Sequence, residues 1–239
     1  MRAGGGAFDE RWLRIYVGHK LRSDPVFPTA FELLRTSRHP LIDLGCGVGL
    51  LAFYLRERNY PNSIRRHRLR RAQDHPGQIC REQALPEPFF TEQDLGDLFT
   101  GCGDIVISDL LHYLSPNDQV RLLENVGTQL ALGGRLIIRD CPNDGNARFW
   151  LTHLAERFAQ STTWNVRTPL HFPPRDRIMA AFNPAEFSRM IEPLWGKTLF
   201  NNHLFILSVA RPPHCSGLGR TQRYSKLVSP RNVARRHCG

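Results

Sequence analysis

Long apolar runs are missing from this sequence of 239 residues. No run reaches the roughly 18 apolar residues that a membrane-spanning helix needs, so no such helix is expected. The first residues, MRAGGGAFDERW, also lack the apolar region of a signal peptide, and we therefore expect a cytoplasmic location. Hydrophobic residues make up 41% of the chain, which suits one α/β domain with additional segments.

Closely spaced cysteines are missing as well. The chain has six cysteines and no C-x-x-C pair: Cys46, Cys80, Cys102, Cys141, Cys215 and Cys238. Structural zinc sites and disulfide frameworks depend on closely or regularly spaced cysteines. We therefore expect reduced thiols and no metal site.

Acidic residues are scarce in two segments, which together account for the formal net charge of +10. Residues 65–81 contain six arginines and one acid, Asp74, and residues 211–239 contain six arginines, one lysine and no acid. The rest of the chain is close to neutral. The basic charge is therefore local, which argues against a broad nucleic-acid-binding surface.

The remaining sequence alternates between short apolar runs and amphipathic stretches. Apolar runs predict buried strands at residues 40–45, 105–108 and 133–140. Amphipathic spacing predicts helices at residues 47–58, 115–132 and 144–160, after two short helices before residue 40. This alternation predicts an α/β fold with a mostly parallel sheet and right-handed crossovers.

The last patterned stretch predicts a short helix at residues 183–195 and then a hairpin at residues 196–211. Asn201 and Asn202 are typical of its turn. Such a hairpin would add an antiparallel strand to the edge of the sheet.

Beyond Arg211 turn-forming residues dominate without a sustained period, so we expect disorder there. The predicted units are an N-terminal helical cap at residues 1–39, a folded domain at residues 40–211 and a basic tail at residues 212–239.

The stretch DLGCGVG places Gly45, Gly47 and Gly49 between a predicted strand and a predicted helix. Glycine lets the backbone turn tightly and approach a ligand, and the following helix N-terminus favours an anionic group. The spacing is G-x-G-x-G after an acid, which differs from the G-x-G-x-x-G of dinucleotide-binding enzymes. An ordinary strand–helix turn is the alternative.

This stretch resembles motif I of class I S-adenosylmethionine-dependent methyltransferases, and the order of elements is similar from Tyr16 to Arg211. The resemblance implies a Rossmann-like, doubly wound, mostly parallel seven-stranded sheet with an antiparallel C-terminal hairpin strand. It also implies S-adenosyl-L-methionine as cofactor. In that family the loop cradles the methionine part of the cofactor and the preceding acid orients its amino group. The matching residues here are Asp43, Gly45, Cys46, Gly47 and Gly49.

Two further stretches fit the same family. EQDLGD resembles the segment that contacts the adenine amino group, which implies that role for Asp94 and the Leu95 backbone. A loop or capping acid is the alternative for Asp94. DIVISDLLHYLSP resembles the fourth strand and the loop after it, and the resemblance implies that Asp109 and Leu110 line the cofactor.

A methyltransferase needs a general base only where the acceptor must lose a proton. The same loop makes His112 the first candidate, followed by Tyr113 and by Asp140 at the end of the fifth strand. Packing beneath the sheet edge is the alternative for His112 and Tyr113. The aromatic residues of the 141–184 segment suggest a wall for an apolar or planar acceptor, and core packing explains them equally well.

The family usually ends the second strand with an acid that accepts hydrogen bonds from the cofactor ribose. Counting from Gly49, this acid should lie between Arg66 and Arg70, where the sequence has arginines and no acid. Arginine has no acceptor. The 65–88 segment also has poor strand character. An irregular strand whose backbone holds the ribose would explain both observations.

A second explanation is that residues 65–88 are a frameshifted reading. RHRLRRAQD can be encoded by codons that, read one base later, give GIDYDARK, an apolar strand end followed by an acid. The composition of the tail after Arg211 is similar to that of this segment. The coding DNA around residues 60–90 tests the hypothesis.

Three functions follow from these observations. The first is methyl transfer from S-adenosylmethionine to a small-molecule acceptor. The second is a catalytically inactive relative with an impaired cofactor site. The third is a nucleic-acid methyltransferase, which the local distribution of charge and the absence of an N-P-P-Y-type motif disfavour. The sequence leaves the acceptor and the oligomeric state open.

Overall fold

The computed structural model describes residues 6–69, 90–93, 102–161 and 169–210. Asp94, Leu95, most of the 65–88 segment and the predicted tail lie outside these ranges. The domain boundaries given above therefore stay a prediction.

The helices are α1 (Gly6–Ser23), α2 (Val26–Leu34), α3 (Leu50–Glu57), α4 (Pro116–Gln129), α5 (Ala147–Ser161) and α6 (Arg175–Ala180), with a 3-10 turn, η1, at Leu111–Tyr113. The strands are β1 (Leu41–Leu44), β2 (Ile64–Leu69), β3 (Phe90–Gln93), β4 (Asp104–Ser108), β5 (Arg135–Asp140), β6 (Phe187–Pro193) and β7 (His203–Val209). Within the described ranges no helix is long and apolar enough to cross a membrane.

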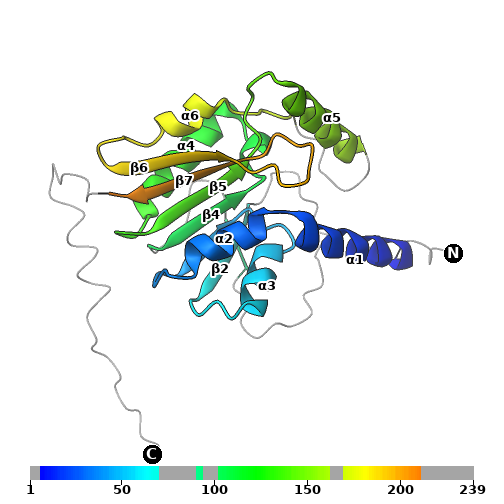
Figure 1. Ribbon diagram of the computed structural model, residues 1–239, viewed down its shortest axis with the longest axis horizontal. Coiled ribbons are helices and arrows are strands. Elements are labelled where there is room, and N and C mark those ends of the chain that lie inside the picture. The colour runs from blue at the N-terminus through cyan, green and yellow to red at the C-terminus, as the bar shows by residue number, and fades with distance from the viewer. Residues whose placement is uncertain (1–5, 70–89, 94–101, 162–168, 211–239) are drawn as a thin grey trace, which may run out of the picture.

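The strands form one seven-stranded sheet in the order β3-β2-β1-β4-β5-β7-β6 (Figure 1). The four pairings among β3, β2, β1, β4 and β5 are parallel, and β7 runs antiparallel to both β5 and β6. The prediction of a mostly parallel α/β sheet with an antiparallel C-terminal hairpin strand is confirmed. The strand order reverses between β1 and β4, and ligands of open α/β sheets bind outside the carboxyl ends of the strands at such a point.

Both faces of the sheet are covered by helices. Successive residues of β1 point to opposite faces, as a two-residue repeat requires. Ile42 and Leu44 join an apolar cluster with α4 and α6, whereas Leu41 joins a second cluster with α2 and α3. Figure 1 shows these two helix pairs on opposite sides of the sheet. Burial on both faces explains why the central strands are apolar throughout.

The predicted helix at residues 183–195 is wrong, because most of it forms the edge strand β6. The helix-like start is a single turn: the Asn183 side chain accepts from the backbone N–H of Ala185 at 3.0 Å, and its carbonyl accepts from Phe187 at 2.9 Å. From there β6 pairs with β7 along its whole length. Backbone pairing with β7 stabilises this segment more than a capped helical turn would. The local sequence pattern does not reveal which strand will be the partner.

The second strand of the predicted hairpin is present as β7, but the predicted position of the turn, at Asn201 and Asn202, is wrong. Residues 194–202 connect β6 and β7, and Asn201 and Asn202 are buried there. The Asn201 amide donates to the Pro142 carbonyl at 3.1 Å and to Asp144 Oδ1 at 3.0 Å. Asn201 therefore anchors the connection to the segment after β5, and neither asparagine forms an exposed turn.

The sequence predicts poor strand character for residues 65–88. This prediction is wrong for residues 65–69, which belong to β2. The strand pairs in parallel with β1, and Asp43 lies opposite Arg66 in the register. Ile64 packs into the α2–α3 cluster, Arg65 is exposed and Arg66 is buried. Main-chain hydrogen bonds to neighbours on both sides hold the strand although its sequence is basic.

Candidate active site

The glycine loop between β1 and α3 has the backbone geometry that its sequence predicts. Gly45, Gly47 and Gly49 have φ angles of +73°, +54° and +79°, a region that other residues rarely adopt. The Gly45 N–H donates to the His67 carbonyl at 2.8 Å, which ties the loop to β2. A Cβ on Gly47 would meet nothing within 4 Å, so the middle of the loop faces open space.

Leu110 and Cys46 complete this loop region. A Cβ on Gly45 would lie 3.0 Å from the Leu110 side chain, so Leu110 packs against the first glycine. The Cys46 carbonyl accepts from the Gly49 N–H at 2.7 Å and closes the turn. The structure thus brings these predicted residues together at the carboxyl end of β1.

Asp43 lies one residue before the end of β1 and is 2% exposed. Burial raises the pKa of its carboxyl to about 7, although the nearby Arg66 lowers it. Within the described part of the chain Oδ2 of Asp43 has no hydrogen-bond partner. An unpaired buried acceptor costs about 1–3 kcal/mol, and a ligand that donates a hydrogen bond there would recover it.

Asp109 lies at the end of β4 with a φ of +53° and takes part in an ion-pair network. Its carboxylate contacts the Arg139 guanidinium and lies 3.4 Å from Lys20 Nζ. Arg139 also bonds Asp24 at 3.1 Å, so the network joins α1 to β4 and β5. Burial raises the pKa of Asp109, but Arg139 and Lys20 hold it below the ordinary value. Asp24 and Arg139 carry no local signal in the sequence and were not predicted.

His112 lies in η1 beside the carboxyl end of β5. Its Nδ1 is 2.7 Å from Asp140 Oδ1, and both side chains are almost fully buried. Asp140 also accepts from the backbone N–H groups of Leu111 at 2.9 Å and Cys141 at 2.8 Å. These two donors fix the orientation of the Asp140 side chain, so it holds the Nδ1–H tautomer of His112. Nε2 of His112 has no partner among the described residues.

The pKa of His112 lies above its ordinary value. Burial lowers it, but the charges of Asp140 and, further away, Glu156 and Asp109 raise it by more. The Asp140 bond thus makes the free nitrogen a stronger base.

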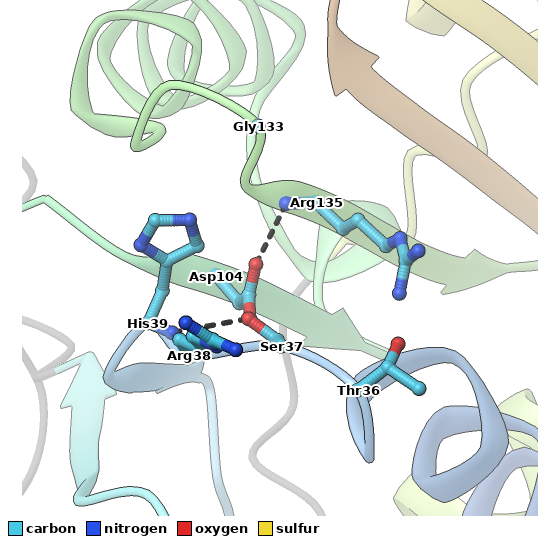
Figure 2. Close-up of a pocket in the computed structure, with 7 residues that line it drawn as sticks. All are labelled: Thr36, Ser37, Arg38, His39, Asp104, Gly133 and Arg135. Atoms are coloured by element: carbon cyan, nitrogen blue, oxygen red, sulfur yellow. Dashed lines mark hydrogen bonds between the residues drawn. The ribbon is translucent and has the colours of Figure 1, made fainter.

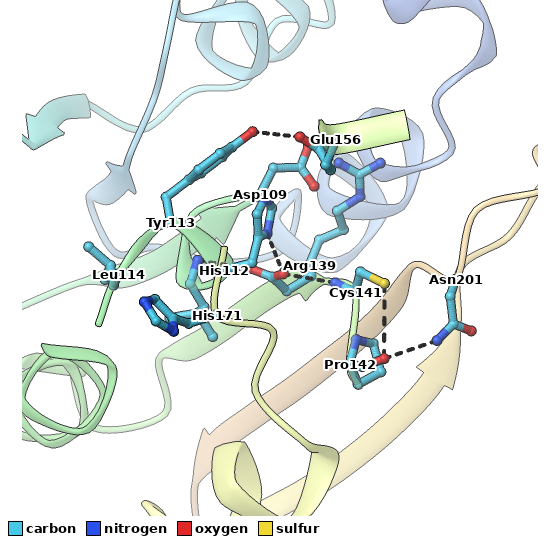
Figure 3. Close-up of polar contacts among 12 residues, drawn as sticks. Asp109, His112, Tyr113, Leu114, Arg139, Cys141, Pro142, Glu156, His171 and Asn201 are labelled. Carbon is cyan, nitrogen blue, oxygen red and sulfur yellow. Dashed lines mark hydrogen bonds and ion pairs between the residues drawn. The ribbon is translucent and has the colours of Figure 1, made fainter. Parts of the chain in front are cut away.

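Aromatic groups surround this imidazole. The Phe172 ring stacks on it at 5.0 Å and 10°, and the Tyr113 ring is 4.2 Å away. Figure 3 shows His112, Tyr113 and His171 around η1, with the Tyr113 hydroxyl joined to Glu156 of α5. That bond is 2.7 Å long and uses the hydroxyl as a donor.

Gln119 was not identified from the sequence. It is 1% exposed, and its amide donates to the carbonyls of Leu111 at 3.0 Å and His171 at 2.6 Å. Together with the bond from the His171 N–H to the His112 carbonyl, it connects η1 to the 169–174 loop. Its place inside α4 resembles that of an ordinary surface glutamine, so the sequence pattern offers no signal for it.

Cys141 is a buried thiol directly after β5. Burial, with Asp140 nearby, raises the pKa of Cys141 to about 12, so this thiol stays protonated. In the part of the chain that the structure describes, no group of three or more potential metal ligands comes together.

A pocket of about 300 Å³ lies on the opposite edge of the sheet (Figure 2). It is lined by Thr36, Ser37, Arg38, His39, Asp104, Gly133 and Arg135. Asp104 and Arg135 are the first residues of β4 and β5. This pocket therefore lies at the amino ends of the strands, whereas the glycine loop and His112 follow their carboxyl ends. In the pocket Asp104 accepts from the Arg135 N–H at 2.8 Å.

No protein-family model and no curated protein matches the sequence. Solved structures do match. A chain of the complex between the Haloferax volcanii Trm112 methyltransferase activator and a putative methyltransferase is 15% identical, with a TM-score of 0.57; the match covers 87% of this chain and 97% of that one. Magnesium protoporphyrin IX methyltransferase from Synechocystis, with bound SAH, is 16% identical with a TM-score of 0.55, over 86% and 95% of the two chains.

An O-methyltransferase family protein from Burkholderia thailandensis is 17% identical, with a TM-score of 0.52. The match covers 86% of this chain but spans only 62% of that protein. At these identities the similarity concerns the fold. The chain has the Rossmann-like fold of these methyltransferase structures.

Proposed function

We propose that the protein transfers a methyl group from S-adenosylmethionine to a small-molecule acceptor. One observation carries the proposal: the glycine loop with Asp43 and the His112–Asp140 pair lie at the same carboxyl edge of the sheet, beside the reversal of strand order. This arrangement supports a cofactor site and a general base on the same side of the fold.

The residues of the loop fit this cofactor. Oδ2 of Asp43 is an unpaired acceptor suited to the cofactor ammonium, and the open backbone at Gly47 admits a close ligand. The structures of PigF and of human N-acetylserotonin methyltransferase, both similar in fold, hold SAH and SAM. When bound, the cofactor would supply an electrophilic methyl group on its sulfonium.

His112 would act as the general base toward an acceptor hydroxyl. Asp140 would hold the proton on Nδ1, so the lone pair of Nε2 would be available to take the proton of an acceptor hydroxyl. The Asp140 carboxyl group, which contacts Nδ1, would stabilise the imidazolium that results. Tyr113 and Glu156 would shape the approach from the side of α5.

A planar acceptor suits the rings at this site. Phe172 already stacks on the His112 ring, and an aromatic acceptor would find similar offset-stacking surfaces there. An O-methyltransferase family 2 protein from Planctomyces limnophilus, with a TM-score of 0.54, was solved in complex with apigenin. We therefore propose hydroxylated aromatic molecules as the first acceptors to test.

Asp43→Asn tests the cofactor site. Losing a charged hydrogen-bond partner is worth about 1.5–3 kcal/mol, so S-adenosylhomocysteine should bind about ten- to hundredfold more weakly by titration calorimetry. Because the pKa of Asp43 is about 7, the affinity of the unchanged protein should rise from pH 6 to pH 8, and that of the variant should not. Glu124→Gln, an exposed change on α4, is the control. Equal affinities for both variants would contradict the proposal.

A second candidate function is an inactive relative with an impaired cofactor site. The observation in its favour is the buried Arg66 on β2. The family to which the sequence is similar usually has, near the end of this strand, an acid that binds the cofactor ribose. No binding of S-adenosylhomocysteine to the unchanged protein would support this candidate.

A further inference from the structure

Arg66 is a buried cation on β2, beside the last glycine of the glycine loop. It lies opposite Asp43 in the β1–β2 register, so both side chains project toward the α3 side. The arginine is 8% exposed, and its charge lowers the pKa of the Asp43 carboxyl against the larger effect of burial. Its guanidinium is therefore close enough to Asp43 to interact with the same carboxylate that the cofactor would use.

The guanidinium also lies against the last glycine of the loop. A Cβ built on Gly49 would be 2.8 Å from Nη1 of Arg66, closer than real Cβ atoms approach other groups. Gly49 is the N-cap of α3. The positive end of a helix favours an anion, so a cation at this position is electrostatically unfavourable. The arginine side chain fills the space beside Gly49 and close to Asp43.

We propose that the Arg66 side chain is an internal occupant of the glycine cradle: it takes the space beside Asp43 and Gly49 and thereby lowers the affinity for the cofactor. The proposal rests on the proposed function, because it assumes that the cradle binds S-adenosylmethionine. It makes Arg66 a residue that determines what the site accepts, and it predicts that the cradle improves when the arginine is removed.

The neighbouring arginine provides a matched control. Arg65 is on the same strand and has the same charge, but it faces the other side of the sheet and is exposed. Replacing Arg65 lowers the net charge as much as replacing Arg66 does, but leaves the cradle as it is.

Arg66→Ala and Arg65→Ala are compared by calorimetric titration with S-adenosylhomocysteine. We expect Arg66→Ala to bind about tenfold more tightly than the unchanged protein, the effect of about one hydrogen bond to a charged group, and Arg65→Ala to be unchanged. Arg66→Met keeps an apolar stem for packing and replaces the alanine variant if that one does not fold. Affinity equal to or weaker than that of the unchanged protein in the folded Arg66 variant would overturn the proposal.

A second measurement does not depend on the cofactor. Ethylguanidinium at millimolar concentration should enter the space left in Arg66→Ala and raise its melting temperature in a saturable way, with no such rise for Arg65→Ala. No difference between the two variants would overturn the proposal. If ethylguanidinium stabilises Arg66→Ala but S-adenosylhomocysteine binds none of the proteins, Arg66 is an occupant of the cradle and the proposed cofactor is wrong.

Discussion

Individual residues of the site differ in how far the sequence reveals them. Gly45, Gly47 and Gly49 are recognisable because their positive φ angles are a local requirement that mainly glycine meets. His112 is recognisable by its place after β4. Its partner Asp140 lies 28 residues away, and their hydrogen bond exists only because β4 and β5 are neighbours in the sheet.

Asp140→Asn should change how the methylation rate depends on pH. His112 acts as a base when neutral, so the rate of the unchanged protein should rise with pH and level off above the raised pKa of His112. Without the Asp140 charge this rise should occur at lower pH. The plateau should be about 10²–10⁴-fold lower, because the tautomer is no longer held. Initial rates with a hydroxylated aromatic acceptor, measured across a pH range, give both the pH at which the rate rises and the height of the plateau.

Asp176→Asn, in the exposed first turn of α6, is the control for that variant. A pH profile of Asp140→Asn that matches the profile of the control would show that Asp140 does not act through His112.

At the scale of elements, periodicity and capping signals identify most helices, and competition for partners decides the rest. Ser115 and Pro116 start α4 as their types predict, with the Ser115 hydroxyl accepting from the Asp118 N–H at 3.2 Å. The comparable turn at Asn183 leads into β6 because β7 offers a full set of backbone partners. Similar capping signals thus start a helix at Ser115 and lead into a strand after Asn183.

Ser115→Ala should lower the free energy of unfolding by about 1 kcal/mol, since the cap of α4 is lost. Urea denaturation monitored by circular dichroism measures this. Ser115→Thr keeps a hydroxyl acceptor and should recover most of the loss. Equal destabilisation by alanine and threonine would show that the cap is not the cause.

For the whole molecule, the distribution of charge bears on partners. More than half of the formal +10 belongs to residues 211–239. A chain ending at Ala210 should therefore lose most of any RNA affinity measured by fluorescence anisotropy, because phosphate contacts dominate nonspecific binding. RNA affinity that survives this deletion would favour the nucleic-acid methyltransferase interpretation.

The sequence alone determined the α/β class, the glycine loop and the position of the candidate base, because φ requirements, apolar periodicity and helix caps are local properties. Only the tertiary structure decided that Asp140 orients His112, that Arg139 joins Asp24 to Asp109, and that Arg66 lies in the glycine cradle. These contacts depend on which strands are neighbours and in which register. Pairing in the sheet brings together residues that no local pattern relates.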